Sequence, residues 1–420
     1  MKKIFLLICI LGLVLTTGCK TAEILTGDRE LDRDWELVID SAKESTVRVY
    51  LTREDVKLRT WLNDYFASRM MDKYEINLEI KVVDFEDLYT ILENERNKAV
   101  SPGVVDMVIL RDDEFGRLNQ EGYLYEGIAS RVPNNNDWLN HNDQEIRAAQ
   151  GASLDDYGLP LGRDQLVLLF DEDVLEIHPR TSEEMLKFLM ANPKTFTYAD
   201  PTRDATGAAF IQSVIYEMVG PDLMMNLFEE GISQEAVEQV IMPGLDYLKD
   251  LDAYVRKIDG AYPSRQSDVD DLFQMGDVYF SMTKDFAYVD TGIDEEIYPY
   301  GAMSFIYDEG SIGGAYYMAI PTNGFNKSGG LLVINELMSY EVQMQKYLPQ
   351  NYGSLPVYDL NLVPPATLEA FQEASIKRGT LTVEALLGSR YVDLPVRVQD
   401  MINNLWVIHV RDMQEVSPGM

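Results

Sequence analysis

The chain has 420 residues, of which 46% are hydrophobic and 10% aromatic, so it can bury a large core and is too apolar for a disordered protein. Its 36 Lys and Arg residues stand against 70 Asp and Glu residues, which gives a formal net charge of −34. A field of this sign repels polyanions and excludes nucleic acid as an expected partner. The three histidines, His141, His178 and His409, have no partner at metal-ligand spacing, so we expect no metal site.

The first 19 residues have the organisation of an export signal. Lys2 and Lys3 precede an apolar stretch over residues 4–15, and Thr16-Thr17-Gly18-Cys19 follows. The stretch is too short for a stable membrane span. Because a small residue precedes Cys19, the segment resembles the lipobox of bacterial lipoproteins, in which the cysteine is lipidated and becomes the new N-terminus. We expect a signal peptide over residues 1–18 and an extracytoplasmic protein held to a bacterial membrane, facing the periplasm or the cell exterior; ordinary cleavage without a lipid is the alternative.

Cleavage at that point would remove Cys9 and leave Cys19 as the only cysteine. The mature chain is then expected to have no internal disulfide and no catalytic thiol. No later stretch approaches the length of a membrane-spanning segment, so any anchoring would depend on the lipid alone.

The N-terminal half predicts alternating strands and helices. Residues 20–45 are polar and acidic, which indicates a tether or a short surface helix. Alternating and then continuous apolar residues predict strands at 46–51, 76–83 and 105–110, and helical spacing predicts helices at 58–70 and 85–96. Strands that alternate with helices favour an α/β unit with a parallel sheet.

A second α/β unit is predicted after the Gly- and Pro-containing segment 157–162. Strands are expected at 166–170, 195–198 and 278–282, and helices at 181–191, 207–219 and 268–274, with a helical region over 236–257 that is interrupted at Pro243-Gly244. Further strands are expected at 302–307 and 316–320. The chain after residue 327 is predicted to be mainly helical. Residues 310–314 between those strands are interpreted as a hairpin turn, with a backbone cradle for an anion as the alternative.

The sequence carries none of the common signatures of catalysis. There is no G-x-S-x-G elbow, no Walker loop, no dinucleotide-binding G-x-G-x-x-G and no H-E-x-x-H. We therefore expect neither an enzyme nor a cofactor. A glycan-cleaving enzyme is the competing hypothesis, because two carboxylates about 5–10 Å apart suffice for that chemistry and leave weak marks in a sequence.

Candidate ligand-binding residues follow the predicted strands or begin the predicted helices. Ligands of open α/β sheets bind beyond the carboxyl ends of the strands, and free amides at a helix start can bind an anion. The opposing interpretation is that the Asp and Thr residues only cap helices. Tyr316 and Tyr317 lie on opposite faces of their strand, so only one can face a cleft. The candidates are Thr52, Arg53, Arg111, Asp112, Arg163, Asp164, Asp204, Thr206, Gly207, Thr283 and Tyr316.

Several segments resemble the solute-binding proteins of bacterial ABC importers, most closely the branch assigned to thiamine import. They are Pro179-Arg180-Thr181, Ala191-Asn192-Pro193, Phe196-Thr197-Tyr198, Gly207 to Phe210, Asp268 to Met282, Asp308 to Gly313 and Asn326 to Ser339. At two places where such relatives carry tryptophan, the chain has Leu51-Thr52-Arg53 and Ile109-Leu110-Arg111. The resemblance is specific over residues 157–375 and architectural over 46–125.

The resemblance implies a type II periplasmic solute-binding protein fold, with two α/β lobes joined by crossing hinge strands. It implies a signal peptide and a tether over residues 1–18 and 19–45, a first lobe from 46–158 and 286–322, and a second lobe from 161–283 and 326–420. The expected function is capture of one small polar molecule and its delivery to a membrane permease with a cytoplasmic ATPase. The protein is expected to act as a monomer; an adhesin with a flat exposed face is a further alternative.

Overall fold

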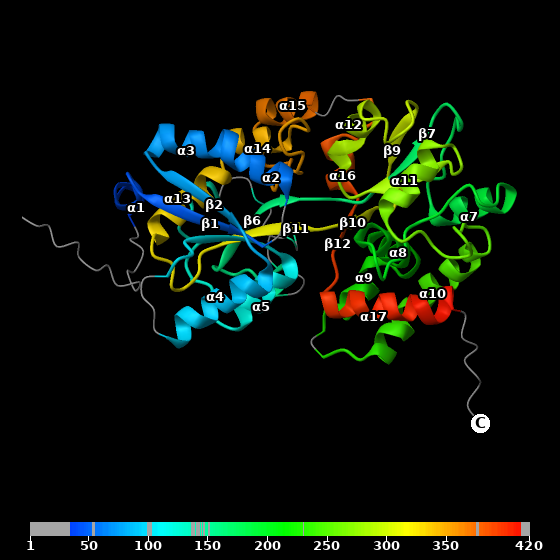
Figure 1. Cartoon of the computed structure of the whole chain (residues 1–420), viewed down its shortest axis with the longest axis horizontal. Coiled ribbons are helices and arrows are strands. Elements are labelled where there is room, and N and C mark those ends of the chain that lie inside the picture. The colour runs from blue at the N-terminus through cyan, green and yellow to red at the C-terminus, as the bar shows by residue number, and fades with distance from the viewer. Residues whose placement is uncertain are drawn as a thin grey trace, which may run out of the picture.

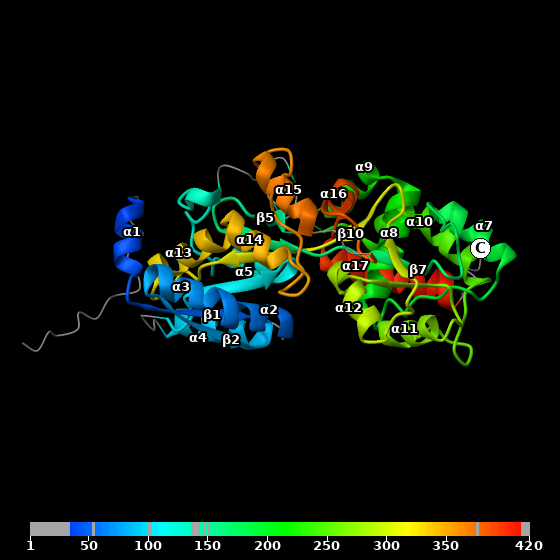
Figure 2. The ribbon, with the colours of Figure 1, turned by 90° about the horizontal axis from the view of Figure 1, so that it is seen from above.

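The chain forms two lobes that lie side by side along the longest axis of the molecule (Figure 1). The structure is a computed structural model that describes residues 34–412, apart from 53–54, 99–102, 136–138, 140–142, 144, 146–147, 150–151, 230 and 375–377. The view from above shows the same two bodies (Figure 2). The lobes correspond to two separate sheets, and short crossing segments connect them.

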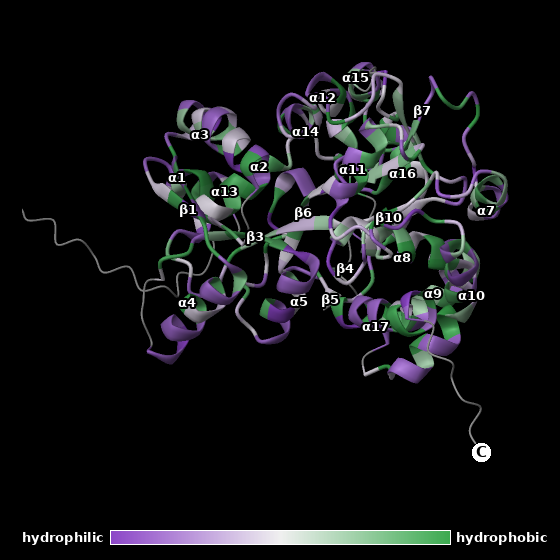
Figure 3. Ribbon diagram, turned by 45° about the vertical axis from the view of Figure 1, so that its right-hand side comes forward, coloured by the Kyte–Doolittle hydropathy of each residue, from purple (hydrophilic) through white to green (hydrophobic). Residues whose placement is uncertain are grey.

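The first lobe is built on a five-stranded mixed sheet with the order β2-β1-β3-β11-β6. β1 pairs in parallel with β2 and β3, and β11 is antiparallel to both of its neighbours, β3 and β6. Both faces of the sheet are covered, which explains the continuous apolar run of β3. Figure 3 shows largely hydrophobic ribbon in β1 and β3, and many hydrophilic residues along α4 and α5. The strands are β1 (Thr46–Leu51), β2 (Asn77–Val82), β3 (Met107–Arg111), β6 (Gly158–Arg163) and β11 (Ala315–Ala319).

Helices from both ends of the sequence surround this sheet. They are α1 (Trp35–Ala42), α2 (Val56–Trp61), the π-helical turn η1 (Leu62–Phe66), α3 (Ala67–Tyr74), α4 (Phe85–Asn97), α5 (Asp112–Gln120), α13 (Lys327–Leu337), α14 (Tyr340–Tyr347) and α15 (Pro365–Ala374). Short elements complete the lobe: η2 (Pro133–Asn135), β4 (Ala148–Ala149) and β5 (Ala152–Ser153).

Two segments of this lobe correct the sequence-based expectation. The part of the expected tether that the structure describes contains α1, whose Val38 and Ala42 are buried, and α1 packs against α13. Helix α13 also contacts β1. It therefore lies in the first lobe, although residues 326–420 were assigned to the second. The apolar face of α13 predicts that the helix is buried but does not specify which sheet buries it.

The second lobe contains a three-stranded antiparallel sheet with the order β8-β7-β9. Its strands are β7 (Val167–Asp171), β8 (Phe280–Thr283) and β9 (Ala302–Phe305). Its helices are α7 (Ser182–Ala191), α8 (Ala205–Val219), α9 (Pro221–Met224), η3 (Met225–Phe228), α10 (Gln234–Asp252), α11 (Gln266–Gln274), η4 (Phe286–Tyr288), α12 (Val289–Asp294), α16 (Val383–Gly388), α17 (Val396–Trp406) and η5 (Val407–Arg411). A buried aromatic cluster of Phe196, Tyr198, Phe210 and Trp406 lies in its core.

Three expectations for the second lobe are wrong. β9 pairs with β7, so residues 302–305 belong to this lobe and not to the first. Residues 195–198 form no strand; they make single backbone hydrogen bonds to Tyr279 and Arg256 instead of a ladder. Pro243 lies inside α10, which continues without interruption. The adjacent Gly244 allows α10 to approach α8 closely, since a Cβ there would lie 2.7 Å from Cγ1 of Ile215.

The lobes are joined where strands of one sheet continue toward the other. β6 pairs with β11 through Arg163, so the chain crosses at residues 164–166 and not at the expected lobe boundary between residues 158 and 161. The return passes through β10 (Ser311–Gly313), which pairs in parallel with β12 (Arg390–Val392), and then through Gly314 into β11. The expected hairpin is therefore a crossing. In the described part of the chain, no helix has the length and apolarity needed to cross a membrane.

Candidate functional site

Two adjoining cavities of about 240 and 150 Å³ lie between the lobes, at the crossing segments. They share Asp164, Ala205, Lys284 and Tyr316 in their walls, so we treat them as one interlobe cleft. Its walls come from α5 in the first lobe, α8 in the second and the crossing strand ends. These sizes and the polar lining are suited to a small polar molecule.

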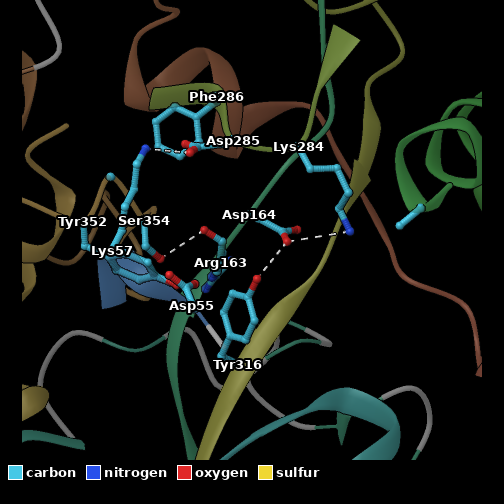
Figure 4. Close-up of a pocket in the computed structure, with 12 residues that line it drawn as sticks. Asp55, Lys57, Arg163, Asp164, Lys284, Asp285, Phe286, Tyr316, Tyr352 and Ser354 are labelled. Carbon is cyan, nitrogen blue, oxygen red and sulfur yellow. Dashed lines mark hydrogen bonds and ion pairs between the residues drawn. The ribbon is translucent and has the colours of Figure 1, made fainter. Parts of the chain in front are cut away.

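Asp164 lies at the centre of the cleft (Figure 4), immediately after β6. Its Oδ1 accepts a hydrogen bond from the Gly314 amide at 2.9 Å. Its Oδ2 accepts one from the Tyr316 hydroxyl at 3.2 Å and lies 3.6 Å from Lys284 Nζ. The carboxylate therefore connects the two crossing segments with the end of β8.

The two neighbouring tyrosines of β11 separate as the strand alternation predicts. Tyr316 lines both cavities. Tyr317 is 1% exposed and packs against Phe115 on the other face of the sheet. The side chain of Tyr316 is therefore available to a ligand, and that of Tyr317 belongs to the core.

The start of α5 forms the first-lobe wall. Glu114, 3% exposed, accepts hydrogen bonds from the Arg111 amide and the Thr52 hydroxyl and so closes the first turn. The Arg111 guanidinium pairs with Asp113 and Glu114. Asp112 lines the cleft and is 7% exposed, and its Oδ1 has no hydrogen-bond partner in the described part of the chain. Thr52 therefore has a capping role, whereas Asp112 faces the cleft.

The acid groups in the cleft interact with one another. Burial is the main cause that raises the pKa of Asp112 well above its usual range, and the negative charges of Asp393, Glu145 and Asp164 add to it. Burial also raises the pKa of Asp393 to about 6, with Asp164 and Glu145 contributing in the same direction. Lys284 opposes both shifts. The cleft is thus a region where negative charge is concentrated and insufficiently balanced.

The larger cavity has a different character at its far end. Lys57 pairs with Asp285 at 2.8 Å, and the Tyr352 hydroxyl donates to Asp55 at 3.1 Å. Phe286 adds an apolar ring to this wall (Figure 4). This end therefore offers paired charges and aromatic surface.

Arg163 was predicted as a ligand-binding residue, and its position indicates a structural role. Its side chain is 6% exposed, and Nη1 lies 2.9 Å from Asp143 and 3.3 Å from Glu145. Nη2 donates to the Val357 carbonyl at 3.1 Å. Arg163 lines the larger cavity, but its guanidinium is committed to the hinge.

The start of α8 follows the capping interpretation. Oδ1 of Asp204 accepts hydrogen bonds from the amides of Thr206 and Gly207, so these amides are not available to an anion. Gly207 is required for packing, since a Cβ there would lie 2.0 Å from the Ala199 carbonyl oxygen. From this segment, Ala205 lines the cleft.

The remaining predicted positions contribute less. Thr283 is 9% exposed and accepts a hydrogen bond from the Asp285 amide; its neighbours Lys284 and Asp285 line the cleft in its place. Arg53 and Cys19 lie outside the described residues. Among the described residues, no group of three or more His, Cys, Asp or Glu side chains is arranged to hold a metal ion.

Several cleft residues were missed by the sequence-based prediction. Lys284 and Asp285 follow the predicted strand end closely, so a wider window there would have included them. Asp393 follows the three-residue strand β12, and Tyr352 lies in the turn after α14. Neither position carries a signal in the sequence, because each reaches the cleft only through contacts between distant segments.

Comparison with known proteins agrees with this geometry. The family described as Bacterial extracellular solute-binding protein matches residues 69–372. The chain belongs to this family. It is 28% identical over 343 residues to Protein YnjB of Escherichia coli (strain K12), an alignment that covers 81% of this chain and 86% of YnjB.

Solved structures of similar shape support the fold. An ABC transporter protein from Clostridium perfringens gives a TM-score of 0.59 at 17% identity and covers 87% of this chain and 99% of its own. The maltose-binding protein MalE of Listeria monocytogenes, solved with maltose, gives 0.59 at 16% identity and covers 89% and 94%. The chain therefore has the type II periplasmic solute-binding protein fold, as the sequence resemblance implied.

Proposed function

We propose that this protein is the extracytoplasmic solute-binding component of an ABC importer. It captures one small polar molecule between its lobes and presents it to a membrane permease that a cytoplasmic ATPase drives. The observation that carries this proposal is the interlobe cleft, whose wall combines α5 of one lobe, α8 of the other and the crossing segments around Asp164. The family assignment supports it. The protein acts as a monomer, has no resident cofactor and performs no chemistry on its ligand.

Lobe closure tests this function. A molecule that both lobes contact favours the closed state by its differential affinity for the two states. Small-angle scattering of the full chain with saturating ligand should give a smaller radius of gyration than scattering without it. Binding that leaves the radius unchanged would contradict a two-lobed clamp.

The fate of the captured molecule separates this function from the glycan-cleaving alternative. The protein is purified without denaturation, and molecules released from it by acid are identified by mass spectrometry before and after incubation. A molecule recovered unchanged supports capture. A molecule converted to a product would establish an enzyme and contradict the proposal.

The anchor is proposed on the sequence of residues 1–19, with Cys19 carrying the lipid. Because lipid would be the only attachment, Cys19→Ala should release the protein from the membrane fraction and abolish incorporation of labelled fatty acid. Continued fractionation with membranes would overturn the anchor and leave solute capture unaffected. The assignment to a thiamine importer depends only on the sequence resemblance and awaits a direct binding measurement with thiamine.

A further inference from the structure

The side chain of Asp112 has an oxygen that accepts no hydrogen bond in the described part of the chain, although Glu114 in the same turn is bonded. It is 7% exposed, and its buried Oδ1 has no hydrogen-bond partner in the described part of the chain. A buried polar group without a partner costs free energy. Its neighbour Glu114, on the same turn, accepts two hydrogen bonds. Of these two carboxylates, that of Asp112 lines the cleft and keeps the unpaired oxygen. Gln212 lines the same cavity, and its Oε1 also has no hydrogen-bond partner in the described part of the chain.

Carboxylates from three parts of the chain line the same cavity. Asp112 comes from the first lobe, Asp164 from the crossing after β6, and Asp393 from the second lobe after β12. Asp164 and Asp393 converge on Gly314: a Cβ built there would lie 3.2 Å from Oδ1 of Asp164 and 3.7 Å from Oδ2 of Asp393. Both lobes and the hinge thus contribute negative charge to one place.

Positive charge at this place falls short of the negative charge. Four aspartates line the smaller cavity, together with Arg111 and Lys284. Arg111 is paired with Asp113 and Glu114, away from the other three aspartates. Lys284 approaches Asp164, and its charge lowers the pKa of Asp112, against the larger effects of burial and the neighbouring acids. A ligand that brought a positive charge would reduce this excess of negative charge.

We propose that the cleft binds an organic cation whose protonated primary or secondary amine lies among Asp112, Asp164 and Asp393 and donates a hydrogen bond to Oδ1 of Asp112. This inference rests on the proposed solute-binding function and names its ligand class. An unpaired carboxylate oxygen needs a hydrogen-bond donor, which a quaternary ammonium group lacks, and the excess of negative charge favours a donor that is itself positively charged. The remainder of the molecule extends past Tyr316 toward the aromatic wall of Phe286 and Tyr352 (Figure 4).

The first test separates ligand classes by charge. A small-molecule extract of bacterial cells is passed over a strong cation exchanger at about pH 3, where amines are retained and neutral sugars and organic acids pass through. Each pool is added to the ligand-free full chain, and its melting temperature and heat of binding are measured. The retained pool should stabilise the protein. Stabilisation by the unretained pool alone would overturn the cation while leaving solute capture intact, and no effect of either pool would contradict both.

The second test removes the charge from the probe. Acetylating the amines of the retained pool abolishes their positive charge and leaves metal ions unchanged. The acetylated pool should no longer raise the melting temperature. If it acts as strongly as the untreated pool, the bound species is not an amine and the proposal is wrong.

The third test removes the charge from the protein. Asp112→Asn should weaken binding of the retained pool by about 30-fold or more, since truncation of a buried charge pair costs this much, and Asp393→Asn should also weaken it. Asp87→Asn is the matched control, because Asp87 is an exposed first-turn aspartate of α4 outside the cleft. Equal affinity for Asp112→Asn and Asp87→Asn would overturn the site.

Discussion

Two neighbouring residues, Arg163 and Asp164, belong to two groups of charged residues whose carboxylates differ in how completely they are paired. The contrast concerns the carboxylates, since Nε of Arg163 also has no hydrogen-bond partner in the described part of the chain. Arg163 is held by Asp143, Glu145 and the Val357 carbonyl at the hinge. On the cleft side of Asp164, the Oδ1 atom of Asp112 has no hydrogen-bond partner in the described part of the chain. This contrast between the hinge and the cleft indicates that buried charge serves two purposes in this protein. Paired charge fixes the crossing strands, and unpaired charge is left for a ligand.

Two further basic residues at the hinge, Arg390 and Lys346, also have hydrogen-bond partners. Arg390 donates to Glu145 at 2.7 Å and to the backbone carbonyl of Asp164. Lys346 is fully buried and donates to the Leu161 and Leu355 carbonyls at 2.8 and 3.0 Å. Burial lowers the pKa of Lys346 well below its usual range, and the charge of Arg163 adds to the effect. These contacts connect β6 with the segments before and after it at the point where the chain leaves the first lobe.

The largest expected effect is on the paired side of the comparison. Arg163→Met removes the partner that Asp143 and Glu145 share and leaves Glu145 with Arg390, so the free energy of unfolding should fall by about 3 kcal/mol. Arg180→Met is the control, because its pair with Asp308 is exposed and should contribute about 1 kcal/mol at most. Denaturant unfolding measures both. A similar loss for the two variants would show that the hinge pairing does not stabilise the fold.

Substitution of Asp112, on the cleft side of the comparison, should lower the affinity for the ligand without lowering the stability of the protein. Asp112→Asn should weaken amine binding by about 2–4 kcal/mol while the melting temperature of the ligand-free protein stays the same or rises, because an uncompensated buried charge is removed. Arg111→Ala should leave affinity nearly unchanged, since Arg111 is paired within its own turn. A large loss of stability with intact affinity for Asp112→Asn would make this residue part of the architecture.

Gly314 lies where the carboxylates of Asp164 and Asp393 converge. A substitution there changes the space between them. Gly314→Ala places a Cβ within 3.2 Å of the Asp164 carboxylate, so it should weaken amine binding by roughly tenfold, about 1.4 kcal/mol. Gly388→Ala is the control, because a Cβ there meets nothing within 4 Å. Calorimetric titration of both variants with the cation-exchanger pool decides the point. Equal affinities would place the ligand away from Gly314.

The smallest effect expected is a pH dependence of stability. The pKa of Asp393 is about 6 in the folded protein against an ordinary value of 3.8 for aspartate, and that of Asp112 is also raised. The folded state therefore binds more protons than the unfolded state between these values, and stability decreases as pH rises through this window. Burial is the main cause of the raised pKa of Asp112; the charges of Asp393, Glu145 and Asp164 raise it further, and that of Lys284 lowers it.

Thermal unfolding of the ligand-free protein between pH 7 and about pH 5 measures this dependence. The melting temperature should rise as the pH falls, and it should rise less in the double variant Asp112→Asn, Asp393→Asn. Both proteins share the other acidic groups, so the difference between their two rises reports the titration of Asp112 and Asp393. An identical rise in both proteins would mean that these two groups do not titrate in the window.

Local sequence patterns predicted most elements but not their assignment to lobes. Strand β1 was placed at its observed bounds, and α7 was predicted from its Thr181 cap and its helical spacing. Residues 302–305 and α13 were assigned to the wrong lobe. Periodicity reports whether a segment is buried but does not report which distant strand or helix buries it.

The site shows the same division between local and distant information. Asp112 was found because ligands bind beyond strand ends, and Tyr316 because strand residues alternate. Asp204, Thr206 and Gly207 also looked suitable, but a capping aspartate and an anion-binding helix start share one sequence pattern. Asp393 reaches the cleft from a segment more than 200 residues beyond Asp164. No local pattern could have predicted that position.

The most direct test of the central claim is a crystal structure of the full chain grown with the cation-exchanger pool. One molecule should lie between the lobes, with a nitrogen atom within about 3.2 Å of Oδ1 of Asp112 and with Asp164 and Asp393 around it. A bound molecule that presents a neutral or anionic group to Asp112, or a closed cleft in which this oxygen still has no donor, would contradict it.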